Sequence, residues 1–145
     1  MSNPYQMFIT DGDLETQGVV LNYGKFKVKI ARAGGANKKY KKVLLRKLKP
    51  YKRQIETETL DEDVSTNIMA DIYADSVIIG WGVEDDKGNT VSGIHDMEGN
   101  IIPFNKENVV ATLLALPELF KDIQAQAEKV AVFKAEELET EAKNS

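Results

Sequence analysis

The spacing of apolar residues changes along the chain from a repeat of two to a helical repeat, and this change limits the folds open to it. Phe26, Val28 and Ile30 alternate with lysines, and the run Val19-Val20-Leu21 precedes them across the turn Asn22-Tyr23-Gly24. Alternating apolar residues on either side of a short glycine-containing turn are typical of a half-buried β-hairpin. We therefore expect a β-hairpin near the N-terminus, with its lysine face exposed to solvent or to a partner.

Helical spacing begins after Gly34-Gly35, where Asn37 is suited to cap a helix. The apolar residues of the next segment then recur at helical intervals, and they are Tyr40, Val43, Leu44, Leu48, Tyr51 and Ile55. Pro50 lies inside this pattern. We expect it to kink the helix or to begin a second one, because proline has no N–H and clashes with the preceding turn.

Three further helices are expected. The first follows the capping box Thr59-Leu60-Asp61-Glu62 and ends near Gly80. Its buried stripe would be Leu60, Val64, Ile68, Ile72 and Ile79. Asn105 is expected to cap the second helix, which runs through Leu116, and Pro117 suits the first turn of the last one.

Two related turns lie between these helices. Asp86-Lys87-Gly88-Asn89 and Asp96-Met97-Glu98-Gly99-Asn100 both lead into β-branched residues, as in a small hairpin or meander. The predicted fold class is therefore α+β and mainly α. It has an N-terminal β-hairpin, then a bundle of about four helices with a small β-turn or hairpin insertion near residues 83–103. By domains, we expect an irregular segment at 1–17, a single α+β domain at 18–135 and a flexible acidic tail at 136–145.

The residues that carry most enzyme chemistry are scarce. The chain has no cysteine and one histidine, His95, for which an exposed turn position is favoured over a metal or general-base role. The stretches 11–15 and 84–89 resemble calcium loops but lack the full carboxylate spacing with its glycine and distal glutamate. No apolar run approaches the roughly 20 residues that span a bilayer. We expect a cytoplasmic protein that is not an enzyme and has no cofactor, metal or membrane partner.

Charge is divided sharply along the chain. Residues 1–53 hold 13 of the 19 basic residues and three acids, whereas residues 54–145 hold six basic residues and 20 acids. The densest basic block contains the candidate partner-binding residues Lys38, Lys42, Arg46, Lys49 and Arg53. Three interpretations remain open: a solvated helix face balanced by the acidic second half, a surface that docks an acidic protein, and a contact to nucleic-acid phosphates. Nucleic acid is the least favoured of these partners, because the tyrosines and leucines of the block share one helical stripe that suits a core.

Several short motifs follow one another in an order that is similar to that of a known protein group. In chain order they are Phe26–Ala33, Asn37 with Tyr40, Leu48–Arg53, Tyr73–Val77 running into Trp81, Pro103-Phe104 with Glu107-Asn108, and Leu116–Phe120. On these motifs the chain from Gly18 onward resembles the small tail assembly chaperones of long-tailed, siphovirus-like bacteriophages. The second turn at Ser92–Asn100 departs from the single acidic turn expected in that family.

The resemblance implies a chaperone without a catalytic residue or ligand site, which binds the long helical tape-measure protein before the tail tube polymerises around it. It implies action in the host cell cytoplasm and absence from the mature virion, with the major tail protein and self-association as further partners. Exposed apolar residues near Trp81, Phe104, Leu119 and Phe120 are the candidate client contacts, although core packing between the last two helices would explain the same side chains. Rival functions are a structural tail or head component retained in the virion and a nucleic-acid-binding phage protein that uses the basic 38–53 helix.

Overall fold

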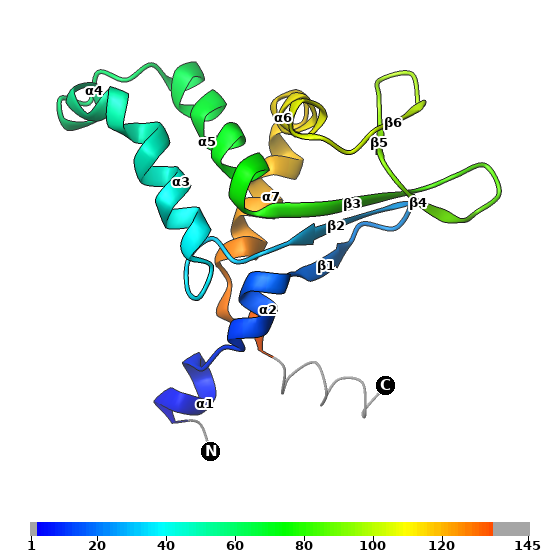
Figure 1. Ribbon diagram of the computed structural model, residues 1–145, viewed down its shortest axis with the longest axis horizontal. Coiled ribbons are helices and arrows are strands. Elements are labelled where there is room, and N and C mark those ends of the chain that lie inside the picture. Colours follow the sequence, from blue (N-terminus) through cyan, green and yellow to red (C-terminus); the bar gives the residue numbers. More distant parts are fainter. Residues whose placement is uncertain (1–2, 135–145) are drawn as a thin grey trace.

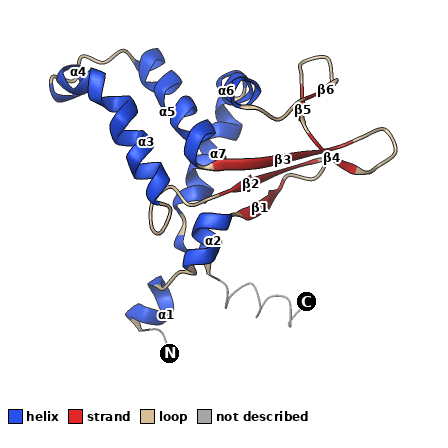
Figure 2. Cartoon of the chain, viewed as in Figure 1, coloured by secondary structure: helices blue, strands red, loops and turns tan. Residues whose placement is uncertain are grey.

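The computed structural model describes residues 3–134 and contains a four-stranded antiparallel sheet with helices packed on its inner face (Figures 1 and 2). The strands are β1 (Val19–Asn22), β2 (Phe26–Ile30), β3 (Ile78–Glu84), β4 (Thr90–Ser92), β5 (Ile94–His95) and β6 (Ile101–Ile102). The helices are α1 (Pro4–Phe8), α2 (Gly12–Gln17), α3 (Lys38–Leu48), η1 (Lys49–Tyr51), α4 (Lys52–Glu56), α5 (Glu62–Ser76), α6 (Lys106–Ala115), α7 (Pro117–Glu128) and η2 (Val130–Phe133). The sheet has the order β1-β2-β3-β4, and β5 pairs with β6 in a separate hairpin. One core cluster joins β2 and β3 to α5, α6 and α7.

The predicted architecture, an N-terminal β-hairpin followed by a bundle of four helices, is wrong. The described chain begins with the short helices α1 and α2, within the segment 1–17 that sequence reasoning expects to be irregular. The strands β1 and β2 do form an antiparallel hairpin, but this hairpin is half of the larger sheet. The helices pack on the inner face of that sheet and do not enclose a core of their own. The predicted tail at 136–145 lies outside the described residues.

Strand β3 is the main reason for this difference. Sequence spacing predicts a helix that ends near Gly80, whereas α5 ends at Ser76 and β3 begins at Ile78. Ile79, which helical spacing assigns to the buried stripe, is exposed, and Trp81 is buried against the core. A β-branched and aromatic run with alternating burial is a strand pattern. The apolar residues here follow the repeat of two of a strand, and their apparent helical spacing was misleading.

The outer face of the sheet carries lysines beside glycines. Lys29 pairs with Gly80 and Lys27 pairs with Gly82 across β2 and β3. A Cβ atom added at Gly80 would lie 3.3 Å from the Cβ of Lys29, and one added at Gly82 would lie 2.9 Å from Cγ2 of Thr90. The two glycines thus give room to the neighbouring strands, which explains why glycine stands in the middle of a central strand.

Both predicted turns form, and they share one hydrogen-bond pattern, although Asp85 and not Asp86 caps the first. Asp85 Oδ1 accepts hydrogen bonds from the backbone N–H groups of Lys87 and Asn89, both at 2.9 Å. Asp96 Oδ1 accepts in the same way from the N–H groups two and four residues later, at 3.0 and 2.8 Å. The first turn joins β3 to β4 and the second joins β5 to β6. An aspartate that caps its own turn is the shared cause.

Helix boundaries follow the local signals in part. Pro50 ends α3 through the single turn η1, Asn105 caps α6 by accepting from the N–H three residues later at 2.9 Å, and Pro117 is in the first turn of α7. These three predictions are confirmed. The predicted capping box at Thr59 is wrong, because the cap of α5 is Asp61, which accepts from the N–H two residues later at 2.8 Å.

The loop before α3 is held by buried polar contacts. Asn37 occupies the predicted position before α3, but its side chain does not make the predicted capping hydrogen bond. Its Nδ2 donates instead to Arg32 O at 2.8 Å and to Ser76 O at 2.9 Å. The carboxylate of Glu15 pairs with the Arg32 guanidinium and accepts from Ala36 N at 3.2 Å. The start of α3 is thereby tied to α2 and to the junction between α5 and β3.

Glu15 should make stability depend on pH. Burial raises the pKa of its carboxyl, but hydrogen bonds from Arg32, Ala36 and Thr10 outweigh burial and lower the pKa overall. The carboxylate therefore stabilises the fold above its unfolded pKa of about 4.3, and this contribution is lost as the pH falls through the lower folded value. We expect Glu15→Gln to lower the free energy of unfolding by about 3 kcal/mol at neutral pH, and by less in acid, as measured by urea unfolding. Glu118→Gln, at an exposed position, is the control. An equal loss at both pH values would contradict a role for the charge.

Candidate functional site

Helix α3, the turn η1 and helix α4 form an arm that extends beyond the sheet (Figure 1). Helix α3 packs on α5 through the buried Val43 and through Tyr40, whose ring meets that of Tyr73 edge-on with centroids 6.0 Å apart. Pro50 then turns the chain into α4. The basic block is on this arm, and most of its cations are exposed.

An ion-pair network joins α3, α5 and α6. Lys47 Nζ of α3 lies 2.7 Å from Asp71 Oδ2 and 3.5 Å from Asp75 Oδ2. Lys106 Nζ of α6 lies 2.7 Å from Asp71 Oδ1 and 3.0 Å from Asp75 Oδ2. The hydrogen bonds that Lys106 donates to Asp71 and Asp75 raise its pKa to about 12. Arg46, a predicted site residue, approaches Asp75 only at 4.0 Å. The acids of α5 thus neutralise the cations on the inner side of α3.

The other cations of the arm are exposed and form no ion pair with a carboxylate of the described residues. They are Lys38, Lys39, Lys41, Lys42, Lys49, Lys52 and Arg53. Four of the five predicted basic site residues belong to this group. The interpretation of a helix face balanced by the acidic second half therefore fits Lys47 and, weakly, Arg46. Within residues 3–134 it does not extend to the outer side of the arm.

Exposed apolar side chains lie among these cations. Leu45 is 60% exposed and Ile55 is 42% exposed. Together with Leu48, Lys49 and Lys52 they line a shallow hollow of about 440 Å³ between α3 and α4. We call this surface the α3–α4 patch. Its apolar centre is bordered by Lys49, Lys52 and one acid, Glu56, and the other exposed cations of α3 lie around it. This is the composition of a surface that binds a mainly acidic amphipathic partner.

Sequence reasoning did not single out the apolar part of this patch. Helical spacing assigns Ile55 to the buried stripe and gives Leu45 no role. A signal was present, because Leu45 directly follows Leu44 and lies about 100° away from it around the helix. Val43 and Leu44 already span about 100° of the buried stripe and Leu45 extends it by another 100°, so the core-facing side cannot contain all three and Leu45 faces outward.

The four predicted apolar contact residues lie apart from the arm. Trp81 is buried in β3 and stacks on Phe26, with ring centroids 5.7 Å apart. Phe120 is buried in α7, and Phe104 and Leu119 are half-buried against the same core. Core packing, the alternative that the sequence left open, describes the position of Trp81 and Phe120. The structure does not bring these residues together with the basic block.

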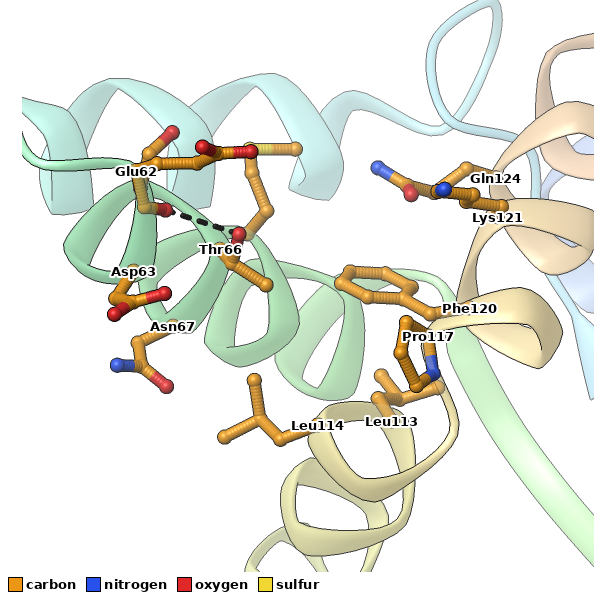
Figure 3. A pocket seen from close by; sticks show the side chains of 12 residues that line it. Glu62, Asp63, Thr66, Asn67, Leu113, Leu114, Pro117, Phe120, Lys121 and Gln124 are labelled. Carbon is orange, nitrogen blue, oxygen red and sulfur yellow. Dashed lines mark hydrogen bonds between the residues drawn. The ribbon is translucent and has the colours of Figure 1, made fainter.

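A second hollow, of about 690 Å³, lies between α5 and the junction of α6 with α7 (Figure 3). Leu114, Pro117 and Phe120 form its apolar side, so Phe120 borders this groove while most of its surface is buried. Glu62 and Thr66 of α5 form part of its polar side, and Thr66 Oγ1 donates to Glu62 O at 3.0 Å within the helix. The hollow is open to solvent and has a polar and an apolar side.

The chemistry-bearing residues of the described chain are dispersed. His95 is exposed on β5. Within residues 3–134, no group of three or more His, Cys, Asp or Glu side chains is placed to hold a metal ion. Over the same residues, none of the helices combines the length and the apolar character that crossing a membrane requires.

Comparison with known protein families gives a match over most of the chain. The sequence model of a family described as YdaY prophage protein matches residues 35–144. The match begins in the loop before α3 and includes every described element from α3 to η2. No curated protein and no solved structure matches the chain. The matched segment therefore contains the α3–α4 patch, the hollow between α5 and the α6–α7 junction, and the β5–β6 hairpin.

The network around Asp71 should hold the arm against the core. Burial raises the pKa of Asp71, but hydrogen bonds from Lys106 and Lys47 outweigh burial and lower it. Its contribution is therefore present above the unfolded pKa of about 3.9 and is lost as the pH falls through the folded value. We expect Asp71→Asn to reduce the free energy of unfolding by about 1 kcal/mol at neutral pH and low salt, measured by urea unfolding. The loss should shrink at high salt. Asp86→Asn, in an exposed turn, is the control. If Asp71→Asn reduced the free energy of unfolding no more than this control, the network would not hold the arm against the core.

Proposed function

Because the chain belongs to the YdaY prophage protein family, we propose that this phage-derived protein is a tail assembly chaperone. In this role it binds the tape-measure protein and keeps it soluble and competent for assembly during tail morphogenesis. It acts without catalysis in the host cell cytoplasm and does not remain in the mature virion. The motifs that resemble those of such chaperones support the proposal, and the structural observation that carries it is the α3–α4 patch.

The patch suits a helical client with acidic borders. Leu45 and Leu48 lie three residues apart on α3, and Ile55 approaches them from α4 across the bend at η1. An amphipathic helix presents apolar side chains at positions i, i+3, i+4 and i+7, which form a stripe that can lie over these three side chains. Carboxylates on either side of that stripe would then meet Lys49 and Lys52, which border the hollow.

The two kinds of side chain contribute differently to binding. Covering what remains exposed of Leu45 and Ile55 is worth about 1 kcal/mol for each side chain. Cations at the border of an interface mainly raise the association rate and make it depend on salt. The apolar centre therefore supplies the affinity of the patch, and the lysines guide acidic client segments to it. Such a contact is weak and reversible, as a chaperone that later leaves its client requires.

A nucleic acid is the rival partner for the same cations. Lysines that contact phosphates give salt-dependent binding without any need for apolar neighbours. Leu45 and Ile55 would remain uncovered against a phosphate backbone, and this observation favours a protein client. The two partners can be distinguished by substitutions that remove the apolar centre and retain every cation.

Coexpression with the tape-measure protein tests the client. We expect a soluble complex to copurify, because the chaperone covers apolar helical surface. The double variant Leu45→Ser, Ile55→Ser should weaken binding about tenfold, as measured by titration calorimetry with a soluble fragment of the tape-measure protein. Val20→Ser, which removes an exposed apolar side chain from β1, is the matched control. A tape-measure protein that is equally soluble alone and copurifies with nothing would refute the proposal.

Charge reversal tests the guiding role of the lysines. In the triple variant Lys38→Glu, Lys42→Glu, Lys49→Glu, we expect slower association with the tape-measure protein and a smaller dependence of the rate on salt. Stopped-flow measurement over a range of ionic strengths gives both quantities. Reversal of Lys25, Lys27 and Lys29 on the hairpin removes as many cations away from the arm and is the control. Unchanged association of the first variant would exclude steering by the arm.

Two further measurements separate the rival functions. In a mobility-shift assay, salt-dependent DNA binding that survives Leu45→Ser, Ile55→Ser but not the charge reversal would favour the nucleic-acid interpretation. Mass spectrometry of purified virions addresses the structural interpretation. Retention of the protein in the particle would favour a tail or head component, and its absence is the result expected for a chaperone.

A further inference from the structure

The N-terminal arm, residues 3–10, carries apolar side chains that the rest of the described chain leaves exposed. It contains no charged side chain. Tyr5 is 78% exposed, Phe8 is 65% exposed, and Met7 and Ile9 are also exposed. Figure 1 shows α1 projecting from α2, away from the sheet. Clustered apolar exposure of this kind marks a contact surface.

The arm has a defined shape before any contact. Asn3 Oδ1 caps α1 by accepting from Gln6 N at 2.9 Å, and a proline occupies the first turn. The base of the arm is attached to the end of the fold, because Asp11 N donates to Phe133 O at 2.8 Å and Lys134 Nζ donates to Gln6 O at 3.0 Å. A preformed and anchored helix loses little freedom when it binds, which lowers the cost of docking.

An apolar groove of matching character lies at the other end of the molecule. It has a volume of about 400 Å³ and lies between the β5–β6 hairpin and α6. We call it the hairpin groove; its apolar lining includes Met97, Ile102, Ala111, Ala115 and Leu116. Met97, at the tip of the hairpin, is 97% exposed, and Leu116 is also exposed. The extra turn at Ser92–Asn100 builds one wall of this groove.

The polar groups around the hairpin groove are largely used within the chain. Asn108 Nδ2 donates to Pro103 O at 2.7 Å, and Thr112 Oγ1 donates to Asn108 O at 2.8 Å. Asp96 Oδ1 accepts the two turn hydrogen bonds described above. What the groove offers a partner is therefore mainly apolar surface. His95 and the carboxylate of Asp96 are the remaining polar groups of the lining. An acidic segment would meet the Asp96 carboxylate there, whereas an uncharged apolar segment would meet no like charge.

We propose that the N-terminal arm of one copy docks in the hairpin groove of a second copy. An uncharged apolar helix and an apolar groove are complementary in chemistry. Figure 1 places α1 and the β5–β6 hairpin at opposite ends of the molecule, with α2 and the sheet between them. Since the base of the arm is fixed at Asp11, an arm cannot reach the groove of its own chain. The occupant of the groove therefore comes from another copy.

This contact joins two different surfaces, so it is heterologous. Each copy retains a free arm at one end and a free groove at the other, and association continues into rings or filaments. Two aromatic side chains bury about 150–250 Å² each. This is well below the roughly 800 Å² per partner of a stable interface, so self-association is weak and depends on concentration. The inference does not rest on the identity of the client.

A mixing experiment tests the contact. Phe8→Asp disables the N-terminal arm. Ala111→Glu, at an exposed position of α6, disables the hairpin groove. Sedimentation at protein concentrations up to about 1 mM should show oligomers for the unaltered protein and monomers for each variant. An equal mixture of the two variants should form heterodimers and nothing larger. The arm of the Ala111→Glu copy enters the intact groove of the Phe8→Asp copy, and neither remaining end can bind. Val20→Asp, on β1, should assemble like the unaltered protein.

The outcomes are separable from failure of folding. Circular dichroism should give the same spectrum for all variants, and a synthetic peptide of residues 3–10 should bind the Phe8→Asp protein but bind Ala111→Glu at least tenfold more weakly. An unaltered protein that stays monomeric, variants that keep full self-association, or a mixture that stays monomeric would each overturn the proposal. Formation of heterodimers in the mixture would establish it, since a symmetric interface cannot be restored by mixing two variants that both lack it.

Discussion

The direction in which helix α3 leaves the sheet depends on the buried amide of Asn37. Its Nδ2 donates to Arg32 O, at the end of the hairpin, and to Ser76 O, at the end of α5. The hydrogen bond to Ser76 O is buried from water, and its loss would leave that carbonyl unsatisfied at a cost of about 1–3 kcal/mol. Helix α3 therefore leaves the sheet in a direction fixed by the core. The α3–α4 patch is presented by a supported helix and not by a free linker.

Signals that act over a few residues could be predicted from the sequence, and those that depend on distant pairing could not. The break at Pro50, the cap at Asn105 and the two aspartate turns are each determined by neighbouring side chains. Strand β3 is determined differently, because Trp81 is placed by its pairing with Val28 on a strand far earlier in the chain. Its alternating glycines, together with Ile79 at helical spacing from Ile72, make it look like the end of α5. Once this strand is missed, the remaining helices suggest only a bundle, and the fold prediction fails as a whole.

The candidate site shows the same division. The position of the basic block could be read directly from the sequence, but its pairing could not. Lys47 is neutralised because packing of α3 on α5 brings it to Asp71 and Asp75, which lie in the acidic part of the chain. The outer cations face no such partner among the described residues. Some of the basic residues before Arg53 thus pair with acids of the core, and others form an exposed surface. Only the structure separates the two groups.

The two proposed contacts differ in the force that holds them, and this difference allows them to work together. Ions screen the cations of the α3–α4 patch over about 8 Å at physiological salt, whereas the uncharged arm and hairpin groove have little charge to screen. Client capture would therefore respond to ionic strength more than self-association does. Copies joined through their N-terminal arms would also present several α3–α4 patches along one long helical client. Each patch could then be weak, because the linked copies raise one another's effective concentration. Release would remain rapid, since it requires only weak contacts to open in turn.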